Sequence, residues 1–166
     1  MKKHTIGILA AYADLYNRLC PGIGGQLQQI MDTMMAECTI EGINFVVSEA
    51  VSTPQQIDRK CRNLAEKKVD LLVVALAPYC PSGALAPSLV SLDMPVVLWP
   101  AQTMYRLVPE KYDSDTIIYN HGVHAVQDLA NVLRKRKRHF GILHGHCEQE
   151  SFKAELIRWA QAGAAV

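Results

Sequence analysis

Two histidines lie three residues apart in the segment YNHGVH (119–124), where a helical pattern begins. Side chains at positions i and i+3 share one face of a helix, so His121 and His124 can act together. Such a pair could ligate a metal ion, form a catalytic pair or contact a substrate. It could equally be solvated or cap the helix locally, because polar residues are common at helix starts.

A metal site would require more donors than these two rings. A catalytic metal usually has three protein ligands, often including a carboxylate. No Asp or Glu is grouped in a ligand-like pattern with His121 and His124, or with His144 and His146 further along the chain. We therefore expect this chain to bind no metal ion and no other cofactor.

Cysteine chemistry is a further alternative, with Cys80 or Cys147 as a nucleophile beside a histidine, although the local sequence does not require it. The five cysteines are an odd number at wide, irregular spacings, and no CxxC motif is present. This usage argues against a disulfide framework or a zinc ribbon and for a reducing compartment. We expect a cytoplasmic protein.

The composition argues against several classes of partner. Hydrophobic residues make up 49% and charged residues 20% of the 166 residues, which is typical of a folded domain. The net charge of +1 gives no general attraction to nucleic acid or to anionic membranes. The basic run RKRKRH (134–139) complements a helix C-terminus, and no apolar run is long enough to span a membrane. We expect neither nucleic acid nor a membrane as a partner.

Five strand-like apolar runs alternate with amphipathic helical patterns along the chain. The runs are residues 5–10, 43–49, 70–77, 95–100 and 139–145. The third run does not alternate polar and apolar residues, which indicates a central strand covered on both faces. Short alternating βα units predict a parallel sheet with helices on both faces. We therefore predict one α/β domain, a doubly wound, five-stranded parallel sheet with the flavodoxin-like strand order 2-1-3-4-5.

The helical patterns carry start signals and buried stripes. Thr53 followed by Pro54 is a helix start, and Ser82 and Asn120 are predicted to cap two later helices. The predicted buried stripe of the Asn120 helix is Val123, Val126, Leu129, Ala130 and Leu133. The segment 101–119 is longer than most connections, so we predict a functional loop or a loop packed on another body.

In doubly wound sheets, ligands bind outside the carboxyl ends of the strands. The loops expected there are residues 12–17, 77–83, 100–105 and 144–148, together with the start of the helix after Asn120. They are rich in Tyr, His and Gln, which offer apolar faces and neutral hydrogen-bonding groups. This chemistry suits an uncharged, polyhydroxylated ligand.

Short motifs in these segments, in consistent order, resemble the N-terminal domain of the L-arabinose/L-fucose isomerase superfamily, and the L-arabinose isomerase branch most closely. The motifs are DLYN (14–17), TPQQIDRKCR (53–62), LAPYCPSG (76–83), PAQTMY (100–105), YNHGVHAV (119–126) and GHCEQ (145–149). They cover nearly the whole chain. Each is weak alone, and their order and spacing together carry the resemblance.

The resemblance implies that residues 1–166 are the N-terminal domain of a longer, metal-dependent aldose–ketose isomerase. In that family the metal, usually Mn²⁺, and the acid/base carboxylates belong to later domains. We therefore expect no catalytic residue in this chain and no activity of the domain alone. Because the family's N-terminal domain lends a wall to the active site of a neighbouring subunit, the expected partners are a monosaccharide, the C-terminal domains and further copies in a homo-oligomer.

By position, the resemblance assigns substrate contacts to Tyr16, Tyr79, Gln102 and His124. His121 stands where the family has a neutral Gln and is expected to take the same role. Both histidine rings should be neutral at pH 7, because the positive end of a helix dipole disfavours an imidazolium. For the two tyrosines, packing between loops is the alternative.

Two further departures from the family leave the sugar unassigned. Ala13 stands in place of a Gln before the Leu-Tyr motif, and Pro100 in place of a His before Thr-Gln. The alternative function is a non-catalytic sugar-binding or sensor domain of flavodoxin-like topology. A ligand site contained in one chain would favour that alternative, and a site completed by another chain would favour the isomerase.

Overall fold

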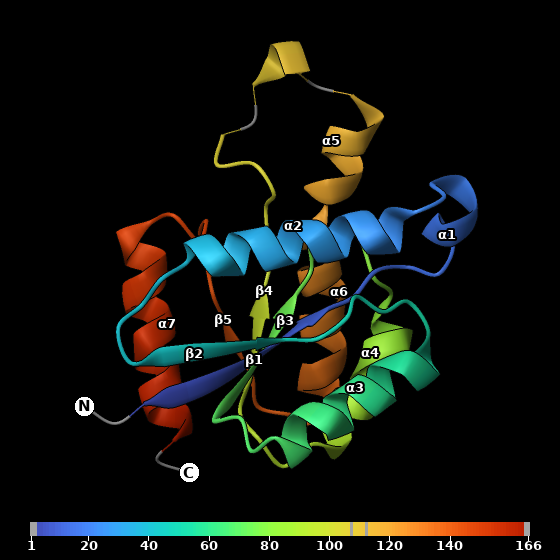
Figure 1. Cartoon of the computed structure of the whole chain (residues 1–166). Coiled ribbons are helices and arrows are strands. Elements are labelled where there is room, and N and C mark those ends of the chain that lie inside the picture. Colours follow the sequence, from blue (N-terminus) through green and yellow to red (C-terminus); the bar gives the residue numbers. More distant parts are fainter. Residues whose placement is uncertain (1–2, 107, 112, 165–166) are drawn as a thin grey trace.

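The computed structural model describes residues 3–106, 108–111 and 113–164 and contains a five-stranded, all-parallel sheet (Figure 1). The strand order is β2-β1-β3-β4-β5, which confirms the predicted 2-1-3-4-5 arrangement. The strands are β1 (His4–Ala10), β2 (Ile43–Val47), β3 (Leu71–Ala75), β4 (Val96–Trp99) and β5 (Gly141–Ile142).

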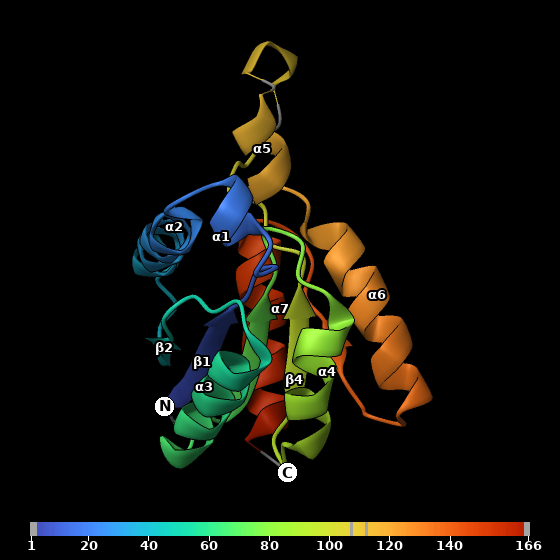
Figure 2. The ribbon, with the colours of Figure 1, turned by 90° about the vertical axis from the view of Figure 1, so that its right-hand side faces the viewer.

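Helices cover both faces of the sheet, as the alternating βα pattern predicts (Figure 2). One face carries α2 (Ile23–Glu37) and α7 (Glu150–Gly163). The single turn α1 (Tyr16–Leu19) comes just before α2 in the chain. The other face carries α3 (Pro54–Glu66), α4 (Ser82–Ser91) and α6 (Gly122–Lys135). Across the described parts of the chain, no helix is both long enough and apolar enough to cross a membrane.

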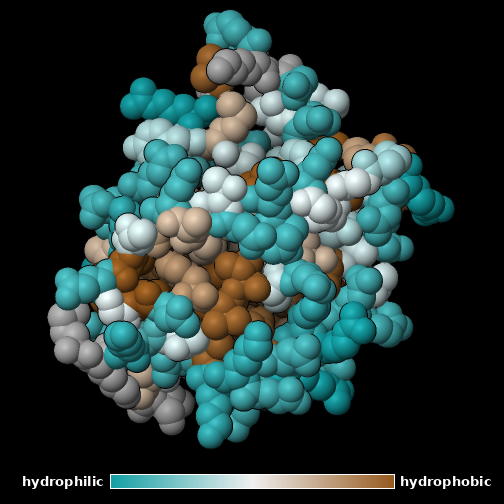
Figure 3. All heavy atoms as spheres, viewed as in Figure 1, coloured by the Kyte–Doolittle hydropathy of each residue, from teal (hydrophilic) through white to brown (hydrophobic). Residues whose placement is uncertain are grey.

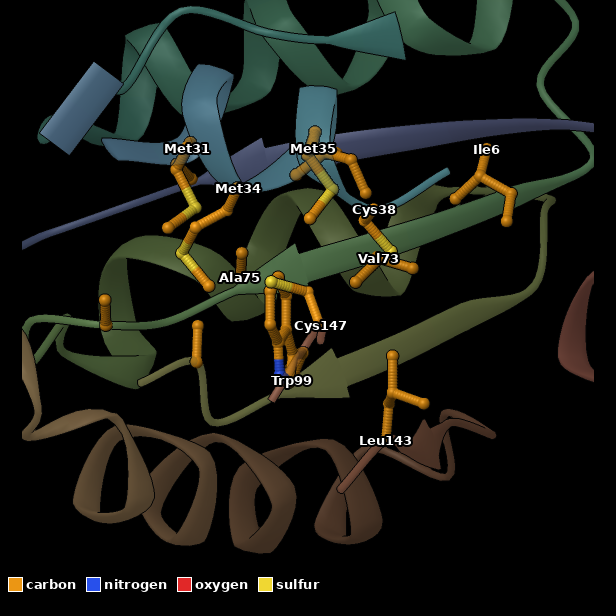
Figure 4. Close-up of a cluster of buried hydrophobic side chains, with 14 of the residues drawn as sticks. Ile6, Met31, Met34, Met35, Cys38, Val73, Ala75, Trp99, Leu143 and Cys147 are labelled. Atoms are coloured by element: carbon orange, nitrogen blue, oxygen red, sulfur yellow. The ribbon is translucent and has the colours of Figure 1, made fainter. Parts of the chain in front are cut away.

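The core is divided between the two faces of β3, which is buried along its whole length. Leu71 and Val73 pack with α2 and α7, whereas Leu72 and Val74 pack with α3, α4 and α6. Figure 4 shows the first of these clusters, where side chains from α2 meet Trp99. The absence of polar alternation in β3 therefore follows from its two covered faces.

The strand β2 lies at one edge of the sheet, has one strand neighbour and is only partly buried. Met35, Ile40 and Phe45 are among the side chains that line a hollow of about 380 Å³ between α2 and this strand. Figure 3 shows apolar atoms gathered on this side of the molecule, below α2. The edge position of β2 thus leaves apolar surface open to solvent.

The fifth strand is shorter than predicted. Residues 139–145 form the apolar run, but only Gly141 and Ile142 pair as strand residues with β4. This strand is at the other edge of the sheet and has β4 as its one neighbour. Gly141 lies directly under Trp159 of α7, where a Cβ atom would come within 2.4 Å of the indole.

The predicted start and buried stripe of α6 need correction. The helix begins at Gly122 with His121 as its N-cap, and Asn120 instead ends the preceding helix, α5 (Ser114–Tyr119). Val123 is not buried but 46% exposed, whereas Ala125 is fully buried. The reason is the helix phase: Gly122 and Val126 fix the face toward the sheet, and Val123 lies about 100° away from that face.

The segment 101–119 is not a plain loop, because it contains the 3₁₀ turn η1 (Pro109–Lys111) and α5. Asp113 caps α5 by accepting a hydrogen bond from the Thr116 N–H at 2.7 Å. The Asn120 side chain accepts from the Thr103 N–H at 3.0 Å and donates to the Thr116 carbonyl at 2.8 Å. These bonds hold the described residues of 103–119, which we call the arm, above the carboxyl edge of the sheet (Figure 1).

Candidate functional site

Four of the five predicted contact residues lie in segments that meet at the carboxyl edge of the sheet. Tyr16 begins α1 after β1, Tyr79 lies in the loop after β3, and His121 and His124 stand at the start of α6. The centroids of the two imidazole rings are 4.4 Å apart, and those of Tyr79 and His121 are 6.2 Å apart. Burial is the main cause that raises the pKa of Tyr79, and the charge of Tyr16 is the last of the nearby contributions; Tyr16 packs on the α2 side of the core and Tyr79 on the α4 and α6 side. We call these four residues the aromatic cluster.

Gly122 allows the histidines to approach the end of β3. A Cβ atom at this position would stand 1.6 Å from the carbonyl oxygen of Leu76. The His121 N–H donates to the Ala77 carbonyl at 2.9 Å, which fixes the first turn of α6 against the same loop. The glycine between two histidines was visible in the sequence, but its close contact is with residues far away in the chain.

Asp128 of α6 was not predicted, and it holds the Tyr79 loop in place. Its carboxylate accepts hydrogen bonds from the Tyr79 hydroxyl at 3.2 Å and from the Ser82 N–H at 2.9 Å. Burial alone would raise the pKa of Asp128, but these hydrogen bonds outweigh burial and lower it. Ser82 therefore does not cap α4 with its side chain, and Pro81 is the N-cap residue.

The same contact defines what Tyr79 can offer a ligand. Burial, followed by the nearby charge of Asp128, raises the pKa of Tyr79, so its hydroxyl stays protonated at neutral pH. Because that proton is donated to Asp128, the hydroxyl oxygen is left to accept a hydrogen bond.

A polar network beneath α1 positions Tyr16 and was also missed. The Asn17 amide donates to Asp14 at 2.9 Å and to Ser52 at 3.1 Å, and Ser52 donates to Asp14 at 2.9 Å. The Ala13 N–H donates to the Tyr79 carbonyl at 2.8 Å, which joins the loops after β1 and β3. Tyr16 and Tyr79 are thus held on two loops that are tied together.

The imidazole nitrogens at the start of α6 are available to a ligand. His121 makes no side-chain capping bond, so the local-capping alternative is wrong for this residue. His124 is exposed, and His121 is partly exposed. Within the described residues, neither ring forms a hydrogen bond. Neutral imidazole can donate from one ring nitrogen and accept at the other, as sugar hydroxyls require.

No hydrogen bond or ring contact joins Gln102 to the aromatic cluster in the part of the chain that the structure describes. Gln102 follows the buried Ala101 and is itself partly exposed. Its neighbour Thr103 lines a different feature, a groove of about 530 Å³ that contains no member of the cluster. The groove runs between α2, the arm and the loop after β5, and its lining residues are Gln26, Gln29, Ile30, Thr33, Met34, Glu37, Thr103, Asp115, Tyr119, His146 and Glu148.

No protein-family model matches this chain, and no curated protein matches it. The resemblance to sugar isomerases is therefore carried by the motifs alone.

The described residues do not fit a manganese centre. Over residues 3–106, 108–111 and 113–164, no three His, Cys, Asp or Glu side chains stand close enough to hold a metal ion. His121 and His124 are therefore not part of a three-ligand group among these residues.

Cys147 Sγ lies 3.8 Å from His146 Nδ1, but burial disfavours the thiol alternative. Burial raises the pKa of Cys80 to about 12 and, as its largest cause, that of Cys147 to about 11. Both side chains are buried, so they are protonated and closed to substrate at neutral pH.

Proposed function

We propose that this chain is the N-terminal domain of a metal-dependent aldose–ketose isomerase and that it supplies one wall of a sugar site. The aromatic cluster is the proposed wall. It offers a hydroxyl oxygen of Tyr79 as acceptor and the nitrogens of His121 and His124 as donors or acceptors. These groups are uncharged when the rings are neutral, and the aromatic faces can pack on the C–H surface of a sugar.

The distribution of exposed apolar side chains carries the proposal that another chain completes this site. Among the described residues, seven large hydrophobic side chains are exposed, and only Val90 lies away from the carboxyl edge of the sheet. The other six belong to α1 and the residue before it, to the arm and to the first turn of α6: Leu15, Leu19, Tyr105, Val108, Ile117 and Val123. A polar patch with apolar residues around it is typical of an interaction surface.

This arrangement divides the chemistry between domains. The cluster can bind and orient a sugar, but the described residues offer no metal ligand set. Metal binding and proton transfer are therefore assigned to the rest of the enzyme, and this chain alone should not isomerise a sugar. The subunit that covers the cluster would also exclude water from the bound sugar.

Titration of the ¹⁵N-labelled chain with L-arabinose and L-fucose tests the division. We expect only weak, non-saturating shifts near His121 and Tyr79 in the chain alone, and saturable binding in a longer protein that carries the remaining domains. Saturable binding of a sugar to the cluster in the isolated chain would overturn the shared site. It would support the alternative of a self-contained sugar-binding or sensor domain.

A further inference from the structure

The groove between α2, the arm and the loop after β5 is built from three separate segments. Gln26, Gln29, Thr33 and Glu37 are spaced at i, i+3, i+7 and i+11, so they share one face of α2. Asp115 and Tyr119 of α5 form the opposite wall, and His146 and Glu148 also line the groove. The Tyr119 hydroxyl donates to the Gln26 side chain, which joins the two long walls.

His146 is a buried side chain with a free donor in this groove. It is only 6% exposed, and its Nδ1 accepts a hydrogen bond from the Glu148 N–H at 3.3 Å. Because Nδ1 can accept only when it carries no proton, the proton of the neutral ring is on Nε2. Among the described residues, no group bonds to Nε2, and the ring lines the groove. Within the described residues, the buried side-chain nitrogens without a partner are His4 Nδ1 and Arg138 Nε, so solvent reaches His146 Nε2, and an acceptor on a ligand can take the place of water there.

The turn that carries His146 is rigid. Gly145 has a φ of +99°, a conformation that favours glycine, and the Gln149 side chain accepts from the His146 N–H at 2.9 Å. Tyr105 packs edge-on against the imidazole with 5.5 Å between ring centroids. The imidazole ring is therefore held in one orientation by the turn and by Tyr105.

The charges around the groove are of one sign. Glu37, Asp115 and Glu148 line it, and among the residues that the structure describes no Lys or Arg does. Arg106 lies over the Tyr105 ring at 5.9 Å and is not among the lining residues. Because the described acids and His146 form no group that could hold a metal ion, their charge is spread along the groove. The volume of about 530 Å³ is in the usual range for a small organic ligand.

We propose that this groove binds a small organic molecule that carries both an ammonium group and hydroxyl oxygens, in the chemical class of amino sugars and amino alcohols. The carboxylates attract the ammonium group. A ligand oxygen accepts from His146 Nε2, and the amides of Gln26 and Gln29 supply further hydrogen bonds to hydroxyl groups. The same charges repel phosphorylated sugars. This proposal is independent of the aromatic cluster, none of whose residues lines the groove.

Calorimetric and ¹⁵N NMR titrations of the chain at low salt test it, with glucosamine as the probe, glucose as the neutral match and glucose 6-phosphate as the anionic match. We expect glucosamine to bind most tightly and glucose 6-phosphate to show no binding, with shifts at residues of the groove. The triple substitution Glu37→Gln, Asp115→Asn and Glu148→Gln should weaken glucosamine binding on the order of tenfold, since exposed charge pairs contribute modestly. All three residues are exposed, so folding should be preserved.

His146→Phe removes the donor while keeping a flat ring, and it should weaken both glucosamine and glucose. The matched control is Glu66→Gln, an exposed acid on α3 at the opposite face of the sheet, which should bind glucosamine like the wild type. The proposal is overturned if glucosamine fails to bind, binds no better than glucose, or binds the triple variant as tightly as the wild type.

Discussion

Gly122→Ala should destabilise the protein because the new methyl group has no room. The Cβ atom would meet the Leu76 carbonyl oxygen at 1.6 Å and its carbonyl carbon at 2.8 Å. Extra atoms in a packed interior cost about 1–3 kcal/mol when the surrounding structure can shift. Here the obstacle is the backbone at the end of the central strand β3. We therefore expect a loss of unfolding free energy of about 3 kcal/mol, the upper part of that range.

Gly25→Ala is the matched control for this substitution. Gly25 lies within α2, and a Cβ atom there meets nothing within 4 Å. Alanine in an open helical position should stabilise the protein by about 0.5–1 kcal/mol. Urea denaturation followed by circular dichroism gives both free energies, and NMR reports whether the signals of His121 and His124 move. If Gly122→Ala unfolds within about 0.5 kcal/mol of the wild type, the packing of α6 against β3 is not as described.

Two further substitution and labelling experiments follow from the site. Asp128 has a lowered pKa in the folded state, so its contribution to stability is present above about pH 4 and is lost as the pH falls through the lowered value. Asp128→Asn should therefore be less stable than the wild type at pH 7, and urea denaturation should show this difference shrink in acid; a constant difference would contradict the hydrogen-bonded carboxylate. In thiol labelling of the native protein, Cys20 should react first, because the other four thiols are buried: Cys38, Cys61, Cys80 and Cys147. Rapid labelling of Cys80 would contradict its burial.

The sheet could be predicted from the sequence because its signals are local. The continuous apolar run of β3 and the helix-start signals Thr53 and Pro54 depend only on neighbouring residues. In the structure, β3 is a buried strand and Thr53 forms a capping box at the start of α3. Converging strand ends then place the loop with Tyr79 near the start of α6. Val126, Leu129 and Leu133 of the predicted stripe are buried, but Val123 lies about 100° from the face toward the sheet, which Gly122 and Ala125 occupy instead.

The remaining parts of the site depend on contacts between distant residues. Tyr79 and Asp128 are 49 positions apart, and Gln26 and Tyr119 are 93 positions apart. No periodicity or motif links such pairs, so neither the support of Tyr79 nor the groove could be derived from one sequence. The arm was read as a loop because α5 has only six residues, too few for a clear amphipathic pattern.

The kinetics of His124→Ala in the proposed full-length isomerase test the central proposal most directly, with Mn²⁺ affinity measured in parallel. Losing one hydrogen bond to a neutral hydroxyl costs about 0.5–1.5 kcal/mol, which is roughly a three- to twelvefold fall in kcat/KM. The matched control is His139→Ala, an exposed histidine just before β5. We predict that His124→Ala lowers kcat/KM in this range, that His139→Ala does not, and that both bind Mn²⁺ like the wild type. A fall of about 10²–10⁴-fold would instead place His124 in acid–base chemistry, and no fall would make it a surface residue; either result contradicts a shared sugar-binding wall.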